Sequence, residues 1–218
     1  MFEIIARNKI AFANGLLVTL ELSILIWIIG LVLGSIVGTL SSKYKFLDKV
    51  NKISSFFLSG IPVLVLLFWA HYPMQAILQI VIDPFITSVV VLSLVNIFAV
   101  SNIVNQSLVD FPEQYTTAAK VCGISSKEIF FKIKFPLIMR QVIPPLLMSQ
   151  VNMLQMTLFA SLISVEEIFR VAQRVNAIEY KPVEIYSALA LFFLIICLPL
   201  NGLAIWLKLK FTRNISEK

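Results

Sequence analysis

The chain carries little charge for its length. Of its 218 residues, 14% are Asp, Glu, Lys or Arg and 59% are hydrophobic, and the mean hydropathy is +0.91. Soluble domains average about 25% charged residues, because their surface must interact with water. The composition therefore excludes a soluble globular protein and predicts an integral membrane protein.

Cysteine and histidine are also scarce. Cys122 lies in a polar stretch, Cys197 lies in an apolar run, and His71 is the single histidine. This scarcity excludes a disulfide framework, and we expect neither a metal site nor catalytic residues. The sequence also lacks the Gly-x-x-x-x-Gly-Lys-Ser/Thr loop that cradles phosphates. We therefore expect no bound cofactor and no ATP hydrolysis by this chain.

Long apolar runs dominate what is present. A bilayer core about 30 Å thick needs roughly 20 apolar residues per helix, and several separate runs reach that length. The expected fold class is an all-α membrane protein with five transmembrane helices in one domain, residues 1–218. The expected spans are residues 16–40, 53–70, 85–109, 142–165 and 185–207.

Several spans carry features beyond hydrophobicity. In the first, Gly30, Gly34 and Gly38 recur every four residues, which places them on one face and predicts a close helix contact. In the second, Pro62 permits a kink. The third and fourth spans contain polar amides, which indicate either a lined pathway or polar helix contacts. These amides are Asn96, Asn102, Asn105, Gln150, Asn152 and Gln155.

Lys and Arg are distributed unevenly between the two sides of the five spans. With the N-terminus outside, 13 of the 18 basic residues face the cytoplasm. The positive-inside rule therefore predicts the N-terminus outside and the C-terminus inside. The net charge of +6 is attributed to these cytoplasmic segments and not to nucleic acid binding.

Residues 111–136 form the longest stretch outside the expected spans, on the cytoplasmic side between spans three and four. Its Pro112 start and Gly123 break predict two short helices joined by a glycine turn. Ser125, followed three residues later by Glu128, has capping-box spacing and predicts a helix start at Ser126. This second helix would carry the apolar residues Ile129, Phe130, Phe131 and Ile133.

Exposed apolar side chains on a short helix need a contact. The helix could lie on the bilayer surface or pack against the spans. It could also insert into a groove of a soluble partner. The residues by themselves favour neither reading.

Two segments of this stretch carry a recognisable pattern, TAAKVCG at Thr117 to Gly123 and KIKFP at Lys132 to Pro136. The pattern resembles the EAA loop of permease subunits of ATP-binding-cassette importers, in which the second short helix docks into a cleft of the ATPase subunit. The resemblance implies an ATPase-coupling contact made by Thr117, Ala118, Ala119, Gly123, Ser125, Glu128, Ile129, Phe130 and Phe131.

Further positions resemble the polar amino acid permeases of that class. They match its Gly-x-x-x-Thr-Leu opening, a Gly and a Pro in the second span, and a Thr and a Glu near the end of the fourth. The matching residues are Gly15, Thr19, Leu20, Gly60, Pro62, Thr157 and Glu167. The resemblance implies a permease subunit that moves a small polar solute, an amino acid above all, across the inner membrane by alternating access.

The chain departs from the family pattern at several positions. Thr117 replaces the Glu that heads the motif, and four charged positions of the membrane region are neutral here. Removing one member of a buried charged network is costly, so joint replacement is expected if the four positions interact. We therefore hypothesise that one polar network, or the solute path, contains Ser59, Asn102, Asn105 and Gln155.

The resemblance also implies partners. One partner is an ATP-binding-cassette ATPase dimer that binds ATP and Mg. Another is a second permease subunit, which is either identical or paralogous to this one. The others are an extracytoplasmic solute-binding protein and membrane lipid. A methionine-type or other small importer is an alternative. An ion-gradient-driven secondary transporter is another, but it would need intramembrane acids or histidines, and Glu21 near one end of the first span is almost the only one.

Overall fold

We describe the fold from a computed structural model, which describes residues 2–216 of the chain and the side chains of residues 3–211. In this part of the chain every element is helical. In chain order the elements are α1 (Phe2–Arg7), α2 (Lys9–Lys43), α3 (Lys45–Gly60), α4 (Val63–His71), α5 (Pro73–Leu78), α6 (Pro84–Val109), α7 (Glu113–Val121), α8 (Ser126–Glu128), the π-helical η1 (Ile129–Lys134), α9 (Phe135–Met156), the 3₁₀ helix η2 (Thr157–Ile163), α10 (Ile168–Glu179) and α11 (Pro182–Ser216).

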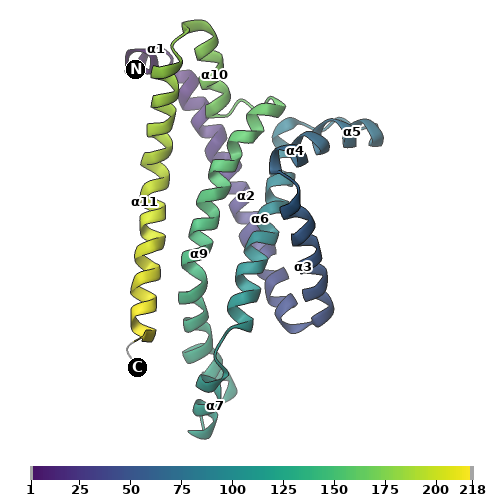
Figure 1. Ribbon diagram of the computed structural model, residues 1–218, viewed down its shortest axis with the longest axis vertical. Coiled ribbons are helices and arrows are strands. Elements are labelled where there is room, and N and C mark those ends of the chain that lie inside the picture. The colour runs from purple at the N-terminus through teal and green to yellow at the C-terminus, as the bar shows by residue number, and fades with distance from the viewer. Residues whose placement is uncertain (1, 217–218) are drawn as a thin grey trace.

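Four of the five expected spans coincide with long apolar helices. Helices α2, α6 and α11 and the continuous helical segment of residues 126–163 are each long and apolar enough to cross a bilayer. The all-α class with four or five candidate spans is therefore confirmed. As Figure 1 shows, α2, α6 and α9 lie side by side, α11 flanks α9, and α3 lies on the opposite side along α6.

The expected second span, residues 53–70, is not one straight helix. Helices α3 and α4 are separated by Ile61 and Pro62, and the two halves bend by 91°. Proline disfavours helical backbone in the preceding residue, and Ile61 is indeed extended, with φ −104° and ψ 123°. The kink expected at Pro62 is thus a complete break, which gives either a broken span or a re-entrant loop.

The fourth span was expected to start near residue 142, at its two prolines. The helix instead begins at Ser126 and runs through η1 and α9, with Pro144 and Pro145 inside it. Membrane helices tolerate internal prolines because neighbouring helices and local adjustments satisfy the freed carbonyls. The second short helix of the 111–136 stretch is therefore the first turn of this long helix.

The predicted glycine face of α2 is a close contact with α6. A Cβ atom on Gly30 would lie 2.1 Å from Nδ2 of Asn96, and one on Gly34 would lie 2.7 Å from the Ile97 carbonyl oxygen. A Cβ on Gly38 would lie 2.6 Å from the Ser101 carbonyl oxygen. Because the contacts advance along α6, from Asn96 through Ile97 to Ser101, as the glycines advance along α2, the two helices run parallel with their backbones nearly touching.

Two of the buried apolar clusters fasten further elements to this α2–α6 pair. One joins α2, α4 and α6 to η2 and includes Leu22, Leu67 and Ile163. The other includes Val104, Phe111 and Ile138 and seats the connection after α6 against the start of α9. The second cluster positions the polar stretch that follows α6.

The glycine contact can be tested by adding one methyl group. We expect Gly34→Ala to lower the free energy of unfolding by about 1–3 kcal/mol, because the new Cβ would overlap α6 backbone. Gly202→Ala is the matched control, since no heavy atom lies within 4 Å of its added Cβ. Thermal unfolding of both variants in the same detergent measures the effect, and equal unfolding midpoints would contradict the close packing.

Candidate functional site

The polar stretch after α6 folds into a helical projection, which we call the tip and define as residues Glu113 to Lys134. Helix α7 ends in a left-handed turn at Gly123, whose φ is +77°. The Gly123 amide donates to the Lys120 carbonyl at 3.0 Å, and the Ile124 amide donates to the Ala119 carbonyl at 3.1 Å. This is a Schellman cap, which favours glycine at that position. The predicted first short helix and the glycine turn are confirmed, whereas the second helix is not short, because it continues through η1 into α9.

The predicted cap after this turn is also confirmed. The Ser125 hydroxyl accepts a hydrogen bond from the Glu128 amide at 3.3 Å and donates to the Glu128 carboxylate at 2.9 Å. Lys132 Nζ donates to the same carboxylate at 2.8 Å. These contacts fix the start of the helix that continues through η1 into α9.

The tip presents aromatic and basic side chains to its surroundings. Phe130 and Phe131 are 46% and 59% exposed and pack edge to face, with ring centroids 5.1 Å apart. Val121 is 84% exposed beside the turn. The exposed basic residues of the tip are Lys120, Lys127 and Lys132. Together these side chains form a mixed apolar and positively charged surface.

Not every residue expected on this surface belongs to it. Ile129 is only 4% exposed, because α7 packs against η1 and covers it. Ala119 is likewise buried, while Thr117 and Ala118 are exposed on α7. Ile129 and Ala119 therefore hold the two halves of the tip together and are not available for contact.

The base of the tip is fixed to the membrane helices. Phe111 is buried, and Lys134 Nζ lies 5.5 Å from the centroid of its ring. On the other side, η1 passes into α9 without a break. The second half of the tip and the middle of the bundle therefore belong to one continuous helix.

The amides of the third span lie in two different environments. Asn102 bonds with α3, accepting from Asn51 Nδ2 at 3.2 Å and donating to the Ser55 hydroxyl at 3.1 Å. Asn105 Nδ2 donates to the Asp48 carboxylate at 2.7 Å. These bonds attach α3 to α6.

No hydrogen bond among the described residues joins Ser59, Asn102, Asn105 and Gln155 into one network, and their role in a solute path stays a prediction. Ser59 is exposed and its hydroxyl donates to the Phe56 carbonyl of its own helix at 3.0 Å. Gln155 is exposed on α9, and no hydrogen bond among the described residues joins it to the other three. Asn102 and Asn105 bond instead to residues of α3 that are not among the positions matching the permease pattern.

The central amides form a helix contact. Asn96, fully buried on α6, donates to Gln150 Oε1 at 2.9 Å, and Gln150 Nε2 on α9 donates back at 3.3 Å. Asn96 Nδ2 also donates to the Ile26 carbonyl of α2 at 3.0 Å, and Trp27 Nε1 donates to the Gln150 carbonyl at 3.0 Å. Gln150 is thus a polar helix contact, whereas Asn152 and Gln155 are exposed on the same helix.

A further junction brings Gly15 and Thr19 together with Glu167, which is far from them in the sequence, at the start of α10. The Ile168 amide, at the start of α10, donates to the Thr19 hydroxyl at 3.1 Å. Glu167 caps the same helix, accepting from the Phe169 and Arg170 amides at 2.9 and 2.8 Å. A Cβ on Gly15 would lie 3.1 Å from the Ile168 Cα, so glycine there lets α10 approach α2.

Glu167 is fully buried between the fourth and fifth candidate spans. Burial raises the pKa of its carboxyl group to about 7, although the two amide hydrogen bonds act in the opposite direction. The sequence signal for this junction was the spacing of Gly15 and Thr19, which places both on one helix face. Nothing in the sequence pairs that face with Glu167.

The fold and the tip define a class. The described residues form a bundle of helices long and apolar enough to cross a membrane, with a capped helical projection that is continuous with α9. Residues 30–213 match the model of the family described as binding-protein-dependent transport system inner membrane component, and the chain belongs to this family. Its members are the membrane components of their transport systems, and not the ATP-hydrolysing subunits.

Curated relatives are similar over most of the chain. The L-cystine transport system permease protein TcyB of Bacillus subtilis is 31% identical over 87% of this chain and 81% of its own length. The glutamine transport system permease protein GlnP of Escherichia coli K12 is 27% identical over 86% and 87%. The histidine/lysine/arginine/ornithine permease protein HisQ of the same strain is 23% identical over 94% of both chains.

Solved structures share the fold. A crystal structure of an amino acid ABC transporter with histidines superposes with a TM-score of 0.83, at 20% identity, over 96% of this chain and 98% of its own. An inward-facing structure of the methionine transporter MetNI superposes with a TM-score of 0.67 at 15% identity, over 96% and 98%.

The buried Glu167 generates a pH prediction. Between pH 4.5 and 7 the carboxyl group is ionised in the unfolded chain but protonated in the folded chain. Unfolding then releases a proton, so the free energy of unfolding falls as the pH rises through this range, by on the order of 3 kcal/mol. Above pH 7 this contribution stays constant.

Thermal unfolding measured from pH 4.5 to 8 checks this prediction. Glu167→Gln should lose the pH-dependent component, because the amide cannot ionise but can still accept a backbone hydrogen bond. Glu166→Gln, a neighbouring acid with a half-exposed side chain, should keep it. If Glu167→Gln keeps the same pH slope as the wild type, the buried carboxyl group is not its source.

Proposed function

We propose that this chain is the permease subunit of an ATP-driven importer that moves an amino acid across the inner membrane by alternating access. The relatives named for transport of cystine, glutamine and basic amino acids support this substrate class. The observation that carries the proposal is the tip, whose exposed aromatic and basic surface stands at the end of a helix that reaches the bundle centre unbroken.

The proposed orientation places the N-terminus outside and the C-terminus and the tip in the cytoplasm. The distribution of basic residues supports it, with 13 of 18 on the cytoplasmic side. With the tip in the cytoplasm, its aromatic and basic surface faces the compartment that contains ATP.

In this proposal the tip is an EAA-type coupling element that docks on an ATP-binding-cassette ATPase dimer, where ATP and Mg bind. Phe130 and Phe131 would enter an apolar cleft, and the surrounding lysines would meet acidic groups at its rim. Thr117 is exposed on α7 at the position where the family motif begins with Glu, so this chain would contact its ATPase there without a charge.

The transport step would follow from movement passed from the tip to the membrane helices. Closure of the ATPase dimer displaces the tip, η1 transmits the displacement to α9, and the Asn96–Gln150 pair carries it to α2 and α6. A second permease subunit, identical or paralogous, would face this one, and an extracytoplasmic binding protein would deliver the solute. Asn152 and Gln155, exposed and polar on α9, are the candidates for solute contact from this chain.

Copurification tests the proposal. From native membranes in mild detergent, the tagged wild-type chain should retain an ATPase subunit that mass spectrometry identifies. Phe130→Asp should lose it, because the substitution puts a carboxylate into the apolar contact. Gly123→Pro should also lose it, because proline cannot adopt a φ of +77° and the turn between the two tip helices would be distorted.

Tyr180→Asp is the matched control. Tyr180 is 84% exposed and is the C-cap residue of α10, and Figure 1 shows α10 at the far end of the molecule from the tip. Its φ of 51° is one that aspartate tolerates. This variant should retain the ATPase as the wild type does. Two results would contradict the coupling role of the tip. One is recovery of the ATPase with all three variants, and the other is failure to recover it with the wild type and with every variant.

A further inference from the structure

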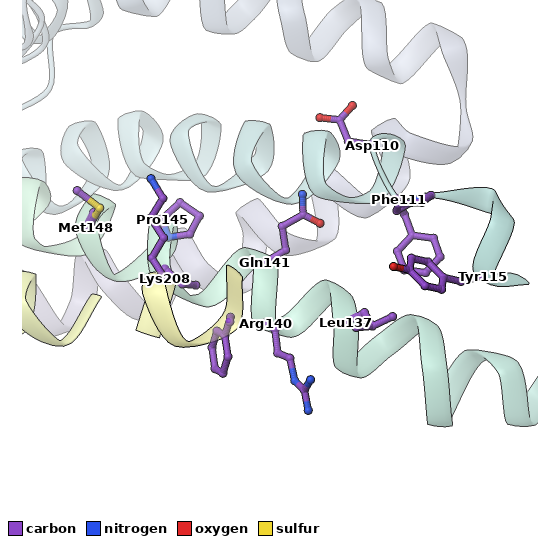
Figure 2. Close-up of a pocket in the computed structure, with 12 residues that line it drawn as sticks. Asp110, Phe111, Tyr115, Leu137, Arg140, Gln141, Pro145, Met148 and Lys208 are labelled. Carbon is purple, nitrogen blue, oxygen red and sulfur yellow. The ribbon is translucent and has the colours of Figure 1, made fainter. Parts of the chain in front are cut away.

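The two ends of the bundle differ in how their polar side chains are arranged. Beside the base of the tip they line a cavity of about 540 Å³, and Figure 2 shows Arg140 extending outward from α9, away from Asp110. At the opposite end, where Figure 1 shows α5 extending sideways from the bundle, polar side chains of α4, α5 and α6 converge. They form a hydrogen-bonded group around His71, the single histidine of the chain.

Gln75 of α5 holds the segment that joins α5 to α6. This residue is 7% exposed, and its Oε1 accepts a hydrogen bond from the Ile82 amide at 2.7 Å. Its backbone carbonyl accepts from the Ile80 amide at 3.1 Å. Gln79 is left-handed, with a φ of 53°, and ends α5. The non-helical segment 79–83 is therefore attached to α5 twice through Gln75.

The Ile82 contact fixes which way the Gln75 side chain points. Because a backbone N–H can only donate, Oε1 must face Ile82, and Nε2 must face the other side. There Nε2 lies 3.1 Å from Nδ1 of His71 and 3.3 Å from Oγ1 of Thr87. The Thr87 hydroxyl donates its own hydrogen to the Asp83 carbonyl at 3.1 Å, so toward Gln75 it can only accept.

This arrangement requires an unprotonated Nδ1 on His71. The Gln75 amide group donates, so the ring nitrogen 3.1 Å away must accept. In a charged imidazole both ring nitrogens carry hydrogen, and neither can accept. The new N–H could still donate to the Thr87 hydroxyl, 3.3 Å away, but it would face the hydrogens of Gln75 Nε2. Gln75 would then have to turn away, and the Ile82 amide would lose its acceptor.

We propose that His71, Gln75 and Thr87 form a proton-sensitive latch on the segment 79–83. With neutral His71 the latch is closed and the segment is held to α5, and protonation of His71 opens it. Histidine side chains in general change charge between about pH 5 and 8. In the orientation proposed above, the latch lies on the extracytoplasmic side and would respond to the pH there. The inference goes beyond the proposed transport activity, because it needs neither the solute nor the ATPase.

Few other titratable groups surround His71. Helices α5 and α6 and η2 pack against α4 and contain no acid, base or tyrosine. Tyr72 follows His71 directly, and the two rings meet edge to face with centroids 4.8 Å apart. The Asp83 carboxylate accepts from the Phe85 amide at 2.8 Å and caps α6. Helix α2 shares an apolar cluster with α4, and its one acid, Glu21, is exposed.

Thiol reactivity in the segment measures the latch. Ile82→Cys and Val81→Cys are made separately in the full-length chain carrying Cys122→Ser, and each purified protein is modified with a maleimide. Ile82 is half-buried and Val81 is 99% exposed, so the ratio of their rates reports opening and cancels the pH dependence of the thiol itself. From pH 8 to pH 5 we expect the ratio of the Ile82→Cys rate to the Val81→Cys rate to rise about five-fold, the effect of losing one hydrogen bond.

Two variants of the latch and one control are measured in the same way. His71→Asn keeps an acceptor toward Gln75 but cannot gain a proton, so the ratio should stay low at every pH. Gln75→Glu can accept from both the Ile82 amide and a protonated His71, so acid should lower the ratio instead of raising it. Asp83→Asn is the matched control for the neighbouring acid. Asparagine also caps helices, so this variant should keep the rise.

The sign of the pH effect decides the outcome. A ratio that does not change with pH in the chain with native His71 and Gln75 would overturn the latch. A rise that persists in His71→Asn, or that disappears in Asp83→Asn, would assign the effect to another group and overturn it as well. Should His71→Asn fail to fold, Gln75→Glu still decides, because a rise at acid pH in that variant contradicts the proposed hydrogen bonding.

Discussion

The amide pair between Asn96 and Gln150 is the interaction on which the rest of the bundle depends. Water is absent from the centre of a bilayer, so an unpaired amide there would cost free energy, and each of these side chains satisfies the other. Asn96 also reaches the Ile26 carbonyl, which is possible because Gly30 leaves room for it. One pair of side chains therefore fixes the relative positions of α2, α6 and α9.

This amide contact determines which helices would move if the tip were displaced. Helix α9 begins as the second half of the tip and carries Gln150 at its centre, with no break between the two. The π-helical turn of η1 and the prolines at 144 and 145 leave this helix continuous. A force applied at Phe130 or Phe131 would therefore reach three helices together. The opposite end is held by a different contact, the one between Thr19 and the start of α10.

Local patterns were predictable from the sequence, and long-range pairings were not. The glycine repeat of the first span, the turn at Gly123 and the cap at Ser125 each depend on neighbours within four residues, and the structure confirms them. The burial of Ile129 and the partners of Asn102 depend on elements that the sequence does not place beside them. Residues 53–70 have enough hydrophobicity for one span, but hydrophobicity says nothing about a 91° bend.

The most direct test of the account uses the native thiol at the tip. Cys122 is exposed and Cys197 is buried, so a maleimide carrying a photoreactive group should attach at Cys122. In inside-out membrane vesicles, illumination should join this chain to an ATP-binding-cassette ATPase subunit, and Cys122→Ser should abolish the product. Labelling of Cys122 only in right-side-out vesicles, or crosslinking that yields no ATPase, would contradict a cytoplasmic tip that couples ATP hydrolysis to transport.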